Sequence, residues 1–248
     1  TAGLIFERGR EHRFRATLDF VDTRKTNEIL FLGPTELVGV ENLFPERVQR
    51  AAPAPGDPHP VGRITLLRTG SVNASWRRSQ NWAGTLTYDW VGCAGGTLEL
   101  RGRLLSYQRY ERQVFANSPV VDQLGHPDGT TPLLRYRGDF NANWSNRRWG
   151  VGLDGQYFHS RILPLLERPA QGSDHIKPYW QFDAYAQVDL SPWIPWKTEH
   201  GGLRAQLRVN NLSGFDYPKY ASDGSGSGVQ PYGDWRGRTY SLSLTATF

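Results

Sequence analysis

The feature that most constrains the fold is a strict alternation of apolar and polar residues at the carboxy-terminal end of the sequence. The apolar positions are Tyr240, Leu242, Leu244, Ala246 and Phe248, and every position between them is Ser or Thr. Successive side chains of a β-strand point to opposite faces, so this segment is predicted to be a strand with one apolar and one polar face. A transmembrane barrel pairs its last strand with its first and leaves no free edge, so the segment fits there. The edge of a soluble sandwich is the alternative.

The same period-two alternation recurs along most of the chain. It predicts strands at 12–20, 97–104, 134–144, 149–157, 180–190 and 203–210, and a strand-rich stretch at 62–90 that has a candidate kink near Thr69–Gly70. With residues 1–7 and the last strand, the pattern gives about nine strands. No regular blade-length repeat is present, which disfavours a propeller. The sequence therefore predicts an all-β chain folded as an antiparallel sheet.

The predicted connections differ in length in a regular way. They are short after Glu7, Trp90 and Trp144, intermediate after Leu190, and long after Val21, Tyr110, His159 and Asn210. Outer-membrane barrels show this asymmetry, with short periplasmic turns and long external loops. The first long connection, Thr23–Pro60, is expected to hold only a short helical piece near Glu36–Val40, because its prolines prevent a longer helix.

Composition limits the function classes. No window approaches the roughly 18–20 consecutive apolar residues of a membrane-spanning helix. A mean hydropathy of −0.56 is compatible with a barrel, where only every second strand residue meets lipid. The net charge of +5 comes mostly from arginines that are spread through the strands without a basic run, which argues against nucleic-acid binding. The chain has no Met, so we expect it to be processed or part of a longer protein.

Aromatic residues gather at the ends of the predicted strands, where an interfacial girdle of a membrane barrel would lie. The candidates for this girdle are Trp90, Trp144, Trp149, Trp180, Tyr240 and Phe248.

The polar face of the predicted strands is rich in Arg, Asp, Asn, Gln and Thr, which suits cross-strand pairs and a wet interior. The residues predicted to face the lumen are Arg13, Arg15, Arg101, Arg103, Arg135, Arg137, Asp139, Arg204 and Arg208. One interpretation is that they pair across strands and hold an internal domain. The other is that those nearest the outside attract an anionic ligand.

Several short motifs near the end of the chain occur in an order that is typical of one family. They are Val209-Asn210-Asn211-Leu212, Phe215, Tyr217-Pro218, Tyr232, Gly237-Arg238 and the alternating strand that ends in Phe248. Two weaker matches lie further back, Leu18-Asp19-Phe20 and Pro45–Arg50. The chain thus resembles the carboxy-terminal part of a TonB-dependent outer-membrane receptor. It departs from the family pattern at Ser213, where an aromatic residue is common, and at Leu86, where many members carry an acid.

The resemblance implies a 22-stranded barrel filled by an amino-terminal plug that contacts TonB. Residues 1–248 would then be a partial barrel domain of about nine strands, without the plug. The implied partners are outer-membrane lipid, TonB through the absent plug, and a small ligand such as a ferric siderophore, in a Gram-negative bacterium. Loop residues that could bind the ligand are Tyr110, His126, Arg161, His175, Tyr220, Tyr232 and Trp235.

The sequence shows no pattern that indicates an enzyme or a cofactor. The six histidines have no metal-ligand spacing, Cys93 is the only cysteine, and the Gly/Ser run at 224–228 lacks the Lys of a phosphate-binding loop. We therefore expect no catalytic residues, no metal and no cofactor. A passive porin-like barrel or an adhesin, and a soluble carbohydrate-binding or hydrolytic β domain, remain the alternative functions.

Overall fold

The computed structural model of this 248-residue chain describes residues 1–56, 61–115, 117–124, 133–165, 167–193, 202–216, 218–219, 233–234 and 236–247. These residues are predominantly β-strand, and the prediction of an all-β, antiparallel chain is confirmed. Contacts divide the chain into two compact units. Unit 1 comprises residues 1–23, 79–110 and 122–248, and unit 2 comprises residues 24–78 and 111–121. Among the described residues, no helix is long and apolar enough to cross a membrane.

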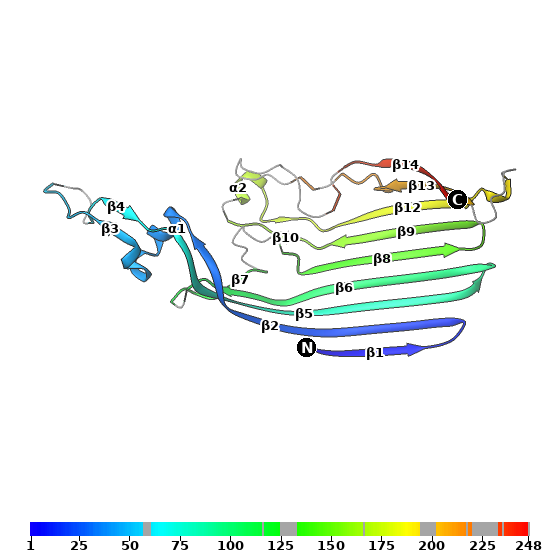
Figure 1. The fold of residues 1–248 in the computed structure, drawn as a ribbon, viewed down its shortest axis with the longest axis horizontal. Coiled ribbons are helices and arrows are strands. Elements are labelled where there is room, and N and C mark those ends of the chain that lie inside the picture. The colour runs from blue at the N-terminus through cyan, green and yellow to red at the C-terminus, as the bar shows by residue number, and fades with distance from the viewer. Residues whose placement is uncertain are drawn as a thin grey trace. The chain divides into compact units, whose positions relative to one another are not determined.

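Unit 1 is built on one antiparallel sheet in which neighbours in sequence are neighbours in space (Figure 1). Nine strands follow one another in the order β1-β2-β5-β6-β8-β9-β12-β13-β14, and β7 pairs only with β6. Their bounds are β1 Ala2–Arg8, β2 His12–Leu32, β5 Gly70–Cys93, β6 Gly96–Gln113, β7 Val121–Asp122, β8 Tyr136–Ser145, β9 Trp149–Phe158, β12 Tyr179–Asp189, β13 Gly202–Asn210 and β14 Thr239–Thr247. The prediction of about nine strands agrees with this path.

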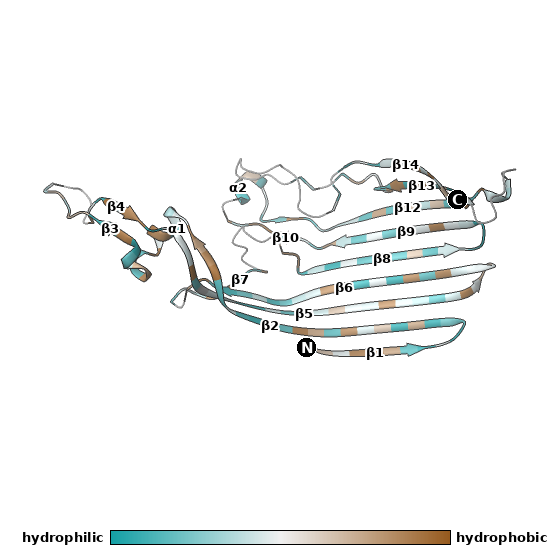
Figure 2. Ribbon diagram, viewed as in Figure 1, coloured by the Kyte–Doolittle hydropathy of each residue, from teal (hydrophilic) through white to brown (hydrophobic). Residues whose placement is uncertain are grey.

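The register places apolar residues opposite apolar residues, and polar residues opposite polar or small residues, on neighbouring strands. The sheet therefore has two chemically different faces. One continuous row of opposed residues is Leu242, Leu207, Ala186, Val151, Trp144 and Leu98. The next row along the strands is Ser241, Arg208, Tyr185, Gly152, Asn143 and Glu99. Directly opposed residues share a face, so we call the side of the first row the apolar face and the side of the second row the polar face. Figure 2 shows the resulting alternation of colour along β2, β5 and β6.

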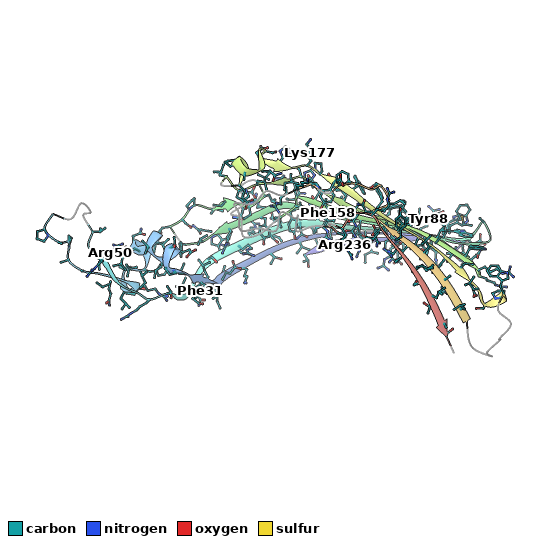
Figure 3. The ribbon with its side chains drawn as sticks, turned by 90° about the horizontal axis from the view of Figure 1, so that it is seen from above. Phe31, Arg50, Tyr88, Phe158, Lys177 and Arg236 are labelled. Atoms are coloured by element: carbon teal, nitrogen blue, oxygen red, sulfur yellow. The ribbon has the colours of Figure 1, made fainter. Side chains whose placement is uncertain are left out.

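Large side chains on the apolar face are exposed to solvent. Leu242, Leu244 and Leu207 are 71%, 64% and 49% exposed, and Phe140 is 37% exposed. Apart from the main sheet, the described residues form only two small sheets of two strands each, β3-β4 and β10-β11. The view of Figure 3, turned by 90° from Figure 1, shows the strands of unit 1 as a single layer. A soluble sandwich would cover its apolar face with a second sheet.

The short and long connections lie at opposite ends of the strands (Figure 1). The turns at 9–11, 94–95 and 146–148 are short, and the segment at 190–201 is intermediate. In the 146–148 turn, the Asn146 side chain accepts the backbone N–H groups of Arg148 and Trp149, both at 2.8 Å. We call this the turn end, and the opposite side, where the connections at 159–178 and 211–238 leave and re-enter the sheet of unit 1, the loop end.

The 159–178 connection carries β10 (Arg161–Ile162), α2 (Arg168–Gln171) and β11 (His175–Ile176), and β10 pairs with β11. The 190–201 segment begins with a 3-10 helix, η3 (Ser191–Trp193).

Unit 2 contains a hydrophobic core of its own. Its elements besides the strand ends are α1 (Pro34–Gly39), the 3-10 helices η1 (Glu41–Leu43) and η2 (Pro45–Arg47), β3 (Val48–Arg50) and β4 (Ile64–Leu67). Leu32, Leu37, Val48 and Phe115 are buried together, with Phe44 and Phe115 edge to face at 5.5 Å. The predicted short helical piece near Glu36–Val40 therefore corresponds to α1.

Two expected loops are strands over part of their length. We expected residues from Thr23 to form a long connection, but β2 continues to Leu32, and β6 runs to Gln113 beyond the expected end near Tyr110. The cause is the unit 2 core, because Leu32 at the end of β2 is 1% exposed there. Burial of large apolar side chains stabilises the extension, although the local alternation of polar and apolar residues is weak.

Candidate functional site

Arg208 on β13 lies at the centre of a charge cluster on the polar face. Its guanidinium is 3.4 Å from a carboxylate oxygen of Asp154 on β9 and 3.7 Å from one of Asp183 on β12. The register sets Asp183 directly opposite Asp154, and two like charges in that arrangement destabilise a sheet. The arginine between them offsets this repulsion, so the three strands are held by one cation shared between two carboxylates.

A ladder of amides and hydroxyls extends this cluster to the neighbouring strands. Asn141 on β8 donates to Asp154, and Asn143 donates to Asn141 at 2.5 Å. The Tyr185 hydroxyl on β12 donates to the Asn143 side-chain oxygen at 2.9 Å. On the other side, Arg208 Nε donates to Asn210 Oδ1 at 3.0 Å, and Asn210 Nδ2 donates to Thr239 Oγ1 at 3.0 Å. The network therefore crosses five neighbouring strands of the main sheet, β8, β9, β12, β13 and β14.

Gly152 on β9 makes room for the Tyr185 ring in this ladder. A Cβ atom at residue 152 would lie 2.1 Å from Tyr185 Cε1 and 2.4 Å from Asn143 Oδ1, which is closer than any real contact. A glycine without a side chain is needed where another group approaches the backbone so closely. The ring thus lies across β9 and reaches Asn143 on the next strand.

Three more of the residues predicted to face the lumen contact a carboxylate. Arg103 donates to Asp139 directly opposite at 2.9 Å, Arg15 contacts Glu7 at 3.0 Å and Arg13 contacts Asp89 at 3.4 Å. Arg13 and Arg15 border a hollow of about 400 Å³ that is also lined by Glu7 and Asp89.

Of the remaining four, Arg204, Arg101 and Arg137 lie at defined register positions. Arg204 is opposite Asp189, and Arg101 is opposite Asn141. The guanidinium of Arg137 lies 5.7 Å from the ring centre of Phe158, the residue opposite it, and Arg135 immediately precedes β8. Arginines and carboxylates therefore balance each other over much of the polar face.

A small aromatic cluster lies on the polar face at the loop end, and the sequence did not reveal it. Phe158 stacks on Tyr179 at 4.9 Å, and Tyr179 stacks on Phe215 at 6.0 Å. Phe158 and Tyr179 are 1% and 6% exposed and are buried with Leu134. Two segments of the 211–238 connection approach this region: Phe215 follows β13, and the Asp234 backbone N–H donates to the buried side chain of Gln181 at 3.2 Å. The only sequence signal was Phe215, one of the residues of the family resemblance.

The structure brings two of the predicted ligand-binding residues onto one hairpin. Arg161 pairs with Ile176, and Ile162 pairs with His175, in the β10-β11 sheet. Arg161 is buried at 8% exposure, whereas His175 is exposed and hydrogen-bonded to Asp174 at 2.6 Å. This bond holds the pKa of Asp174 below its usual range.

Tyr110 lies elsewhere, on β6, with its ring edge-on to Tyr107 at 5.9 Å. The other predicted ligand-binding residues, His126, Tyr220, Tyr232 and Trp235, lie outside the described residues.

The five predicted girdle residues that the structure describes lie at or near strand ends, on the apolar face where the register defines it. Trp144 and Trp149 are at the turn end of β8 and β9, and Trp90 is near the turn end of β5, 5.2 Å from the His12 ring. Trp180 and Tyr240 are at the loop end of β12 and β14. Trp180 contacts Tyr157 at 5.0 Å and stacks on Phe182 at 5.7 Å, and Phe248 lies outside the described residues.

Within the part of the chain that the structure describes, no group of three His, Cys, Asp or Glu side chains is placed to hold a metal ion. Cys93 is a free thiol near the turn end of β5, and its backbone carbonyl accepts the Trp144 indole N–H at 2.9 Å. No model of a known protein family matches the chain, and a search of curated proteins finds no match either.

Proposed function

We propose that this chain is part of the wall of an outer-membrane β-barrel that serves as a receptor and transporter for TonB-coupled uptake of a scarce nutrient. The cargo that the family resemblance favours is a ferric siderophore. In this proposal the apolar face contacts lipid, the polar face lines an aqueous interior, and the long connections are external loops that capture the ligand. The protein has no enzymatic role.

The observation that carries the proposal is the bare apolar face of a single-layered sheet. Rows of Leu, Val, Ala and Trp cross six strands without interruption, and Leu242, Leu244 and Leu207 have about half or more of their surface exposed. Exposed apolar patches of this kind mark sites of membrane or protein contact. A lipid-facing barrel wall accounts for a face that is apolar on every strand and bounded by aromatic residues at both ends.

The dimensions of the apolar face support this assignment. On β9, eight residue steps separate Trp149 at the turn end from Tyr157 at the loop end. At ~3.3 Å per residue these aromatic residues are ~26 Å apart along the strand, close to the roughly 25 Å height of the apolar band of such barrels. Tilt of the strands in a barrel would reduce the spanned height somewhat.

The strand directions constrain how such a barrel closes. Neighbours in the nine-strand path are antiparallel, so the two edge strands, β1 and β14, run in the same direction. Closure with only antiparallel pairs requires an odd number of further strands between these edges, and a total of 22 satisfies this condition. The barrel proposal therefore includes partners for both edges, which would otherwise expose unpaired backbone groups.

Site-directed spin labelling of the protein in its native outer membrane tests the location of the two faces. With Cys93 replaced by serine, single cysteines are introduced at Leu242, Ser243 and Leu244 and labelled with a nitroxide. We expect the labels at residues 242 and 244 to collide mainly with oxygen, which concentrates in lipid, and the label at residue 243 mainly with a water-soluble nickel complex. Equal access of the nickel complex to all three labels would refute the lipid-facing assignment.

Uptake of radioactive ferric iron tests the transport function. The iron is supplied in spent medium from iron-starved cultures of the bacterium that carries the gene, with and without a protonophore. We expect deletion of the gene to abolish an uptake component that the protonophore also abolishes. Uptake that depends on the gene but persists with the protonophore would show a passive barrel, and an unchanged uptake would exclude iron as the cargo.

A further inference from the structure

Asn211 occupies the point at which the chain leaves β13 and enters the longest connection of unit 1. Its backbone is in the left-handed region, with φ of 52°, and the residue is only 2% exposed. Non-glycine residues rarely adopt this conformation, and Asn tolerates it better than most. A buried asparagine side chain needs hydrogen-bond partners, and its partners show what it holds in place.

The side chain of Asn211 closes the turn that follows it. Nδ2 donates to the Phe215 carbonyl at 2.8 Å, and Oδ1 accepts the Phe215 N–H at 3.0 Å and the Ser213 hydroxyl at 3.4 Å. One amide therefore gives and receives a hydrogen bond with the same residue, four positions along the chain. Phe215 is thereby held in place for its stacking on Tyr179.

The backbone of Asn211 connects the same turn to the sheet and to the far end of the connection. Its N–H donates to Asp183 Oδ1 on β12 at 2.8 Å, and its carbonyl accepts Arg238 Nε at 3.3 Å. Arg238 immediately precedes β14, so both ends of the 211–238 connection meet at this residue. Gly214, with φ of 66°, permits the contact, because a Cβ there would lie 2.5 Å from Arg238 Nη2.

We propose that Asn211 is a positioning residue that fixes both ends of the β13–β14 connection on the polar face and so sets how this connection is presented to the ligand. The part that concerns the ligand rests on the proposed function. The chemistry explains the choice of residue: Asp lacks the donor for the Phe215 carbonyl, Gly lacks the whole side chain, and Gln is one methylene longer. Asp183 also contacts Arg208, so the turn is continuous with the charge cluster.

Trypsin cleavage of the folded full-length protein after Lys219 tests this role without any transport measurement. Asn211→Gly keeps the left-handed conformation accessible and removes the side-chain hydrogen bonds. We expect cleavage after Lys219 to be about tenfold faster, because the loss of two good hydrogen bonds makes local opening more frequent. Asn211→Asp keeps the acceptor for the Phe215 N–H and is expected to give an intermediate rate. The control Ser213→Ala, which removes only the 3.4 Å bond, is expected to stay within about twofold of the wild type.

Two further measurements keep the test specific. Cleavage after Arg147, in the exposed turn at the opposite end of the strands, and the thermal unfolding of the sheet are expected to be the same in wild type and Asn211→Gly. Unchanged cleavage after Lys219, or equal acceleration after Arg147, would overturn the proposal. If Asn211→Gly does not fold, Arg238→Met, which breaks only the contact from the far end, is judged by the same criteria. A failed iron-uptake experiment would leave this result unaffected.

Discussion

Replacement of Leu242 by arginine measures directly which medium contacts the apolar face. Leu242 lies in the middle of β14, 71% exposed and opposite Leu207. Its neighbour Ser243 lies on the polar face, opposite Gln206. The variants Leu242→Arg and Ser243→Arg therefore place the same side chain on adjacent residues of one strand, facing in opposite directions.

The two possible environments of Leu242 predict very different energies. If the apolar face lies in hydrocarbon, arginine at residue 242, two positions in from the girdle residue Tyr240, costs roughly 1–3 kcal/mol of unfolding free energy, between the cost at the bilayer centre and that at the interface. If water wets that face, a substitution at a side chain so exposed changes stability by no more than about 0.5 kcal/mol. Ser243→Arg faces polar neighbours in either case, so its effect is expected to be within about 0.5 kcal/mol.

The assay is reversible unfolding in guanidinium of the full-length protein refolded into phosphatidylcholine bilayers, followed by tryptophan fluorescence. We expect the midpoint of Leu242→Arg to fall with an unchanged slope, while Ser243→Arg stays close to the wild type. The reasoning is refuted if Leu242→Arg is also within about 0.5 kcal/mol of the wild type. It is refuted equally if both variants lose the same amount, because the two faces would then not differ.

Three further predictions concern other parts of the chain. Gly152→Ala displaces the Tyr185 ring and is expected to cost about 1–3 kcal/mol of unfolding free energy, measured in the same bilayer assay. Leu37→Ala, at a fully buried side chain in unit 2, is expected to cost about 2–5 kcal/mol, measured as faster amide exchange over residues 34–50. Hydrogen bonds from Arg50 hold the pKa of Glu41 below its ordinary value of 4.5, so their contribution is present above that pH and is lost as the pH falls through the lower folded value.

Each of these predictions has a matched control. Gly102→Ala adds a methyl group where no atom lies within 4 Å and is expected to be neutral, so equal losses would contradict the proposed role of Gly152. Val38→Ala alters a residue beside Leu37 that is 37% exposed and is expected to cost less than half as much. For the acid dependence, Glu41→Gln should remove the decrease in amide protection of unit 2 below pH 4.5, and its persistence would assign the effect to another group.

The alternation of residue types was sufficient to predict the long strands of the main sheet and which of their residues share a face. Thr239–Thr247 alternates without exception, and β8 and β12 nearly so, because one side of each strand must suit a different medium from the other. If one strand shifted by one residue relative to its neighbour, all its apolar side chains would point to the polar face. The sequence pattern therefore excludes pairings that are shifted by an odd number of residues. The row from Leu242 to Leu98 confirms this consistency across six strands.

The features that the sequence did not predict depend on contacts between distant segments. The continuation of β2 to Leu32 is stabilised by packing on Phe115 and Leu37, which no local pattern reveals. The role of Asn211 is hidden for a similar reason, since its partners Asp183 and Arg238 lie 28 and 27 residues away. The motif that contains Asn211 could be recognised in the sequence. The hydrogen bonds that explain the role of Asn211 form only when β12, β13 and β14 are assembled.

The charge balance of the polar face bears on how a ligand would be attracted. Arg208 is shared by Asp154 and Asp183, and Arg103 is paired with Asp139. A paired arginine produces little field beyond its partner, and water and salt in a wet interior screen what is left. These arginines therefore act as cross-links between strands of the sheet, which supports the cross-strand pairing of the first of the two interpretations drawn from the sequence. In the proposed barrel, selection of the ligand would then depend on the long connections. Asn211 holds both ends of the 211–238 connection, so substitutions of Asn211 would perturb ligand capture without altering the sheet.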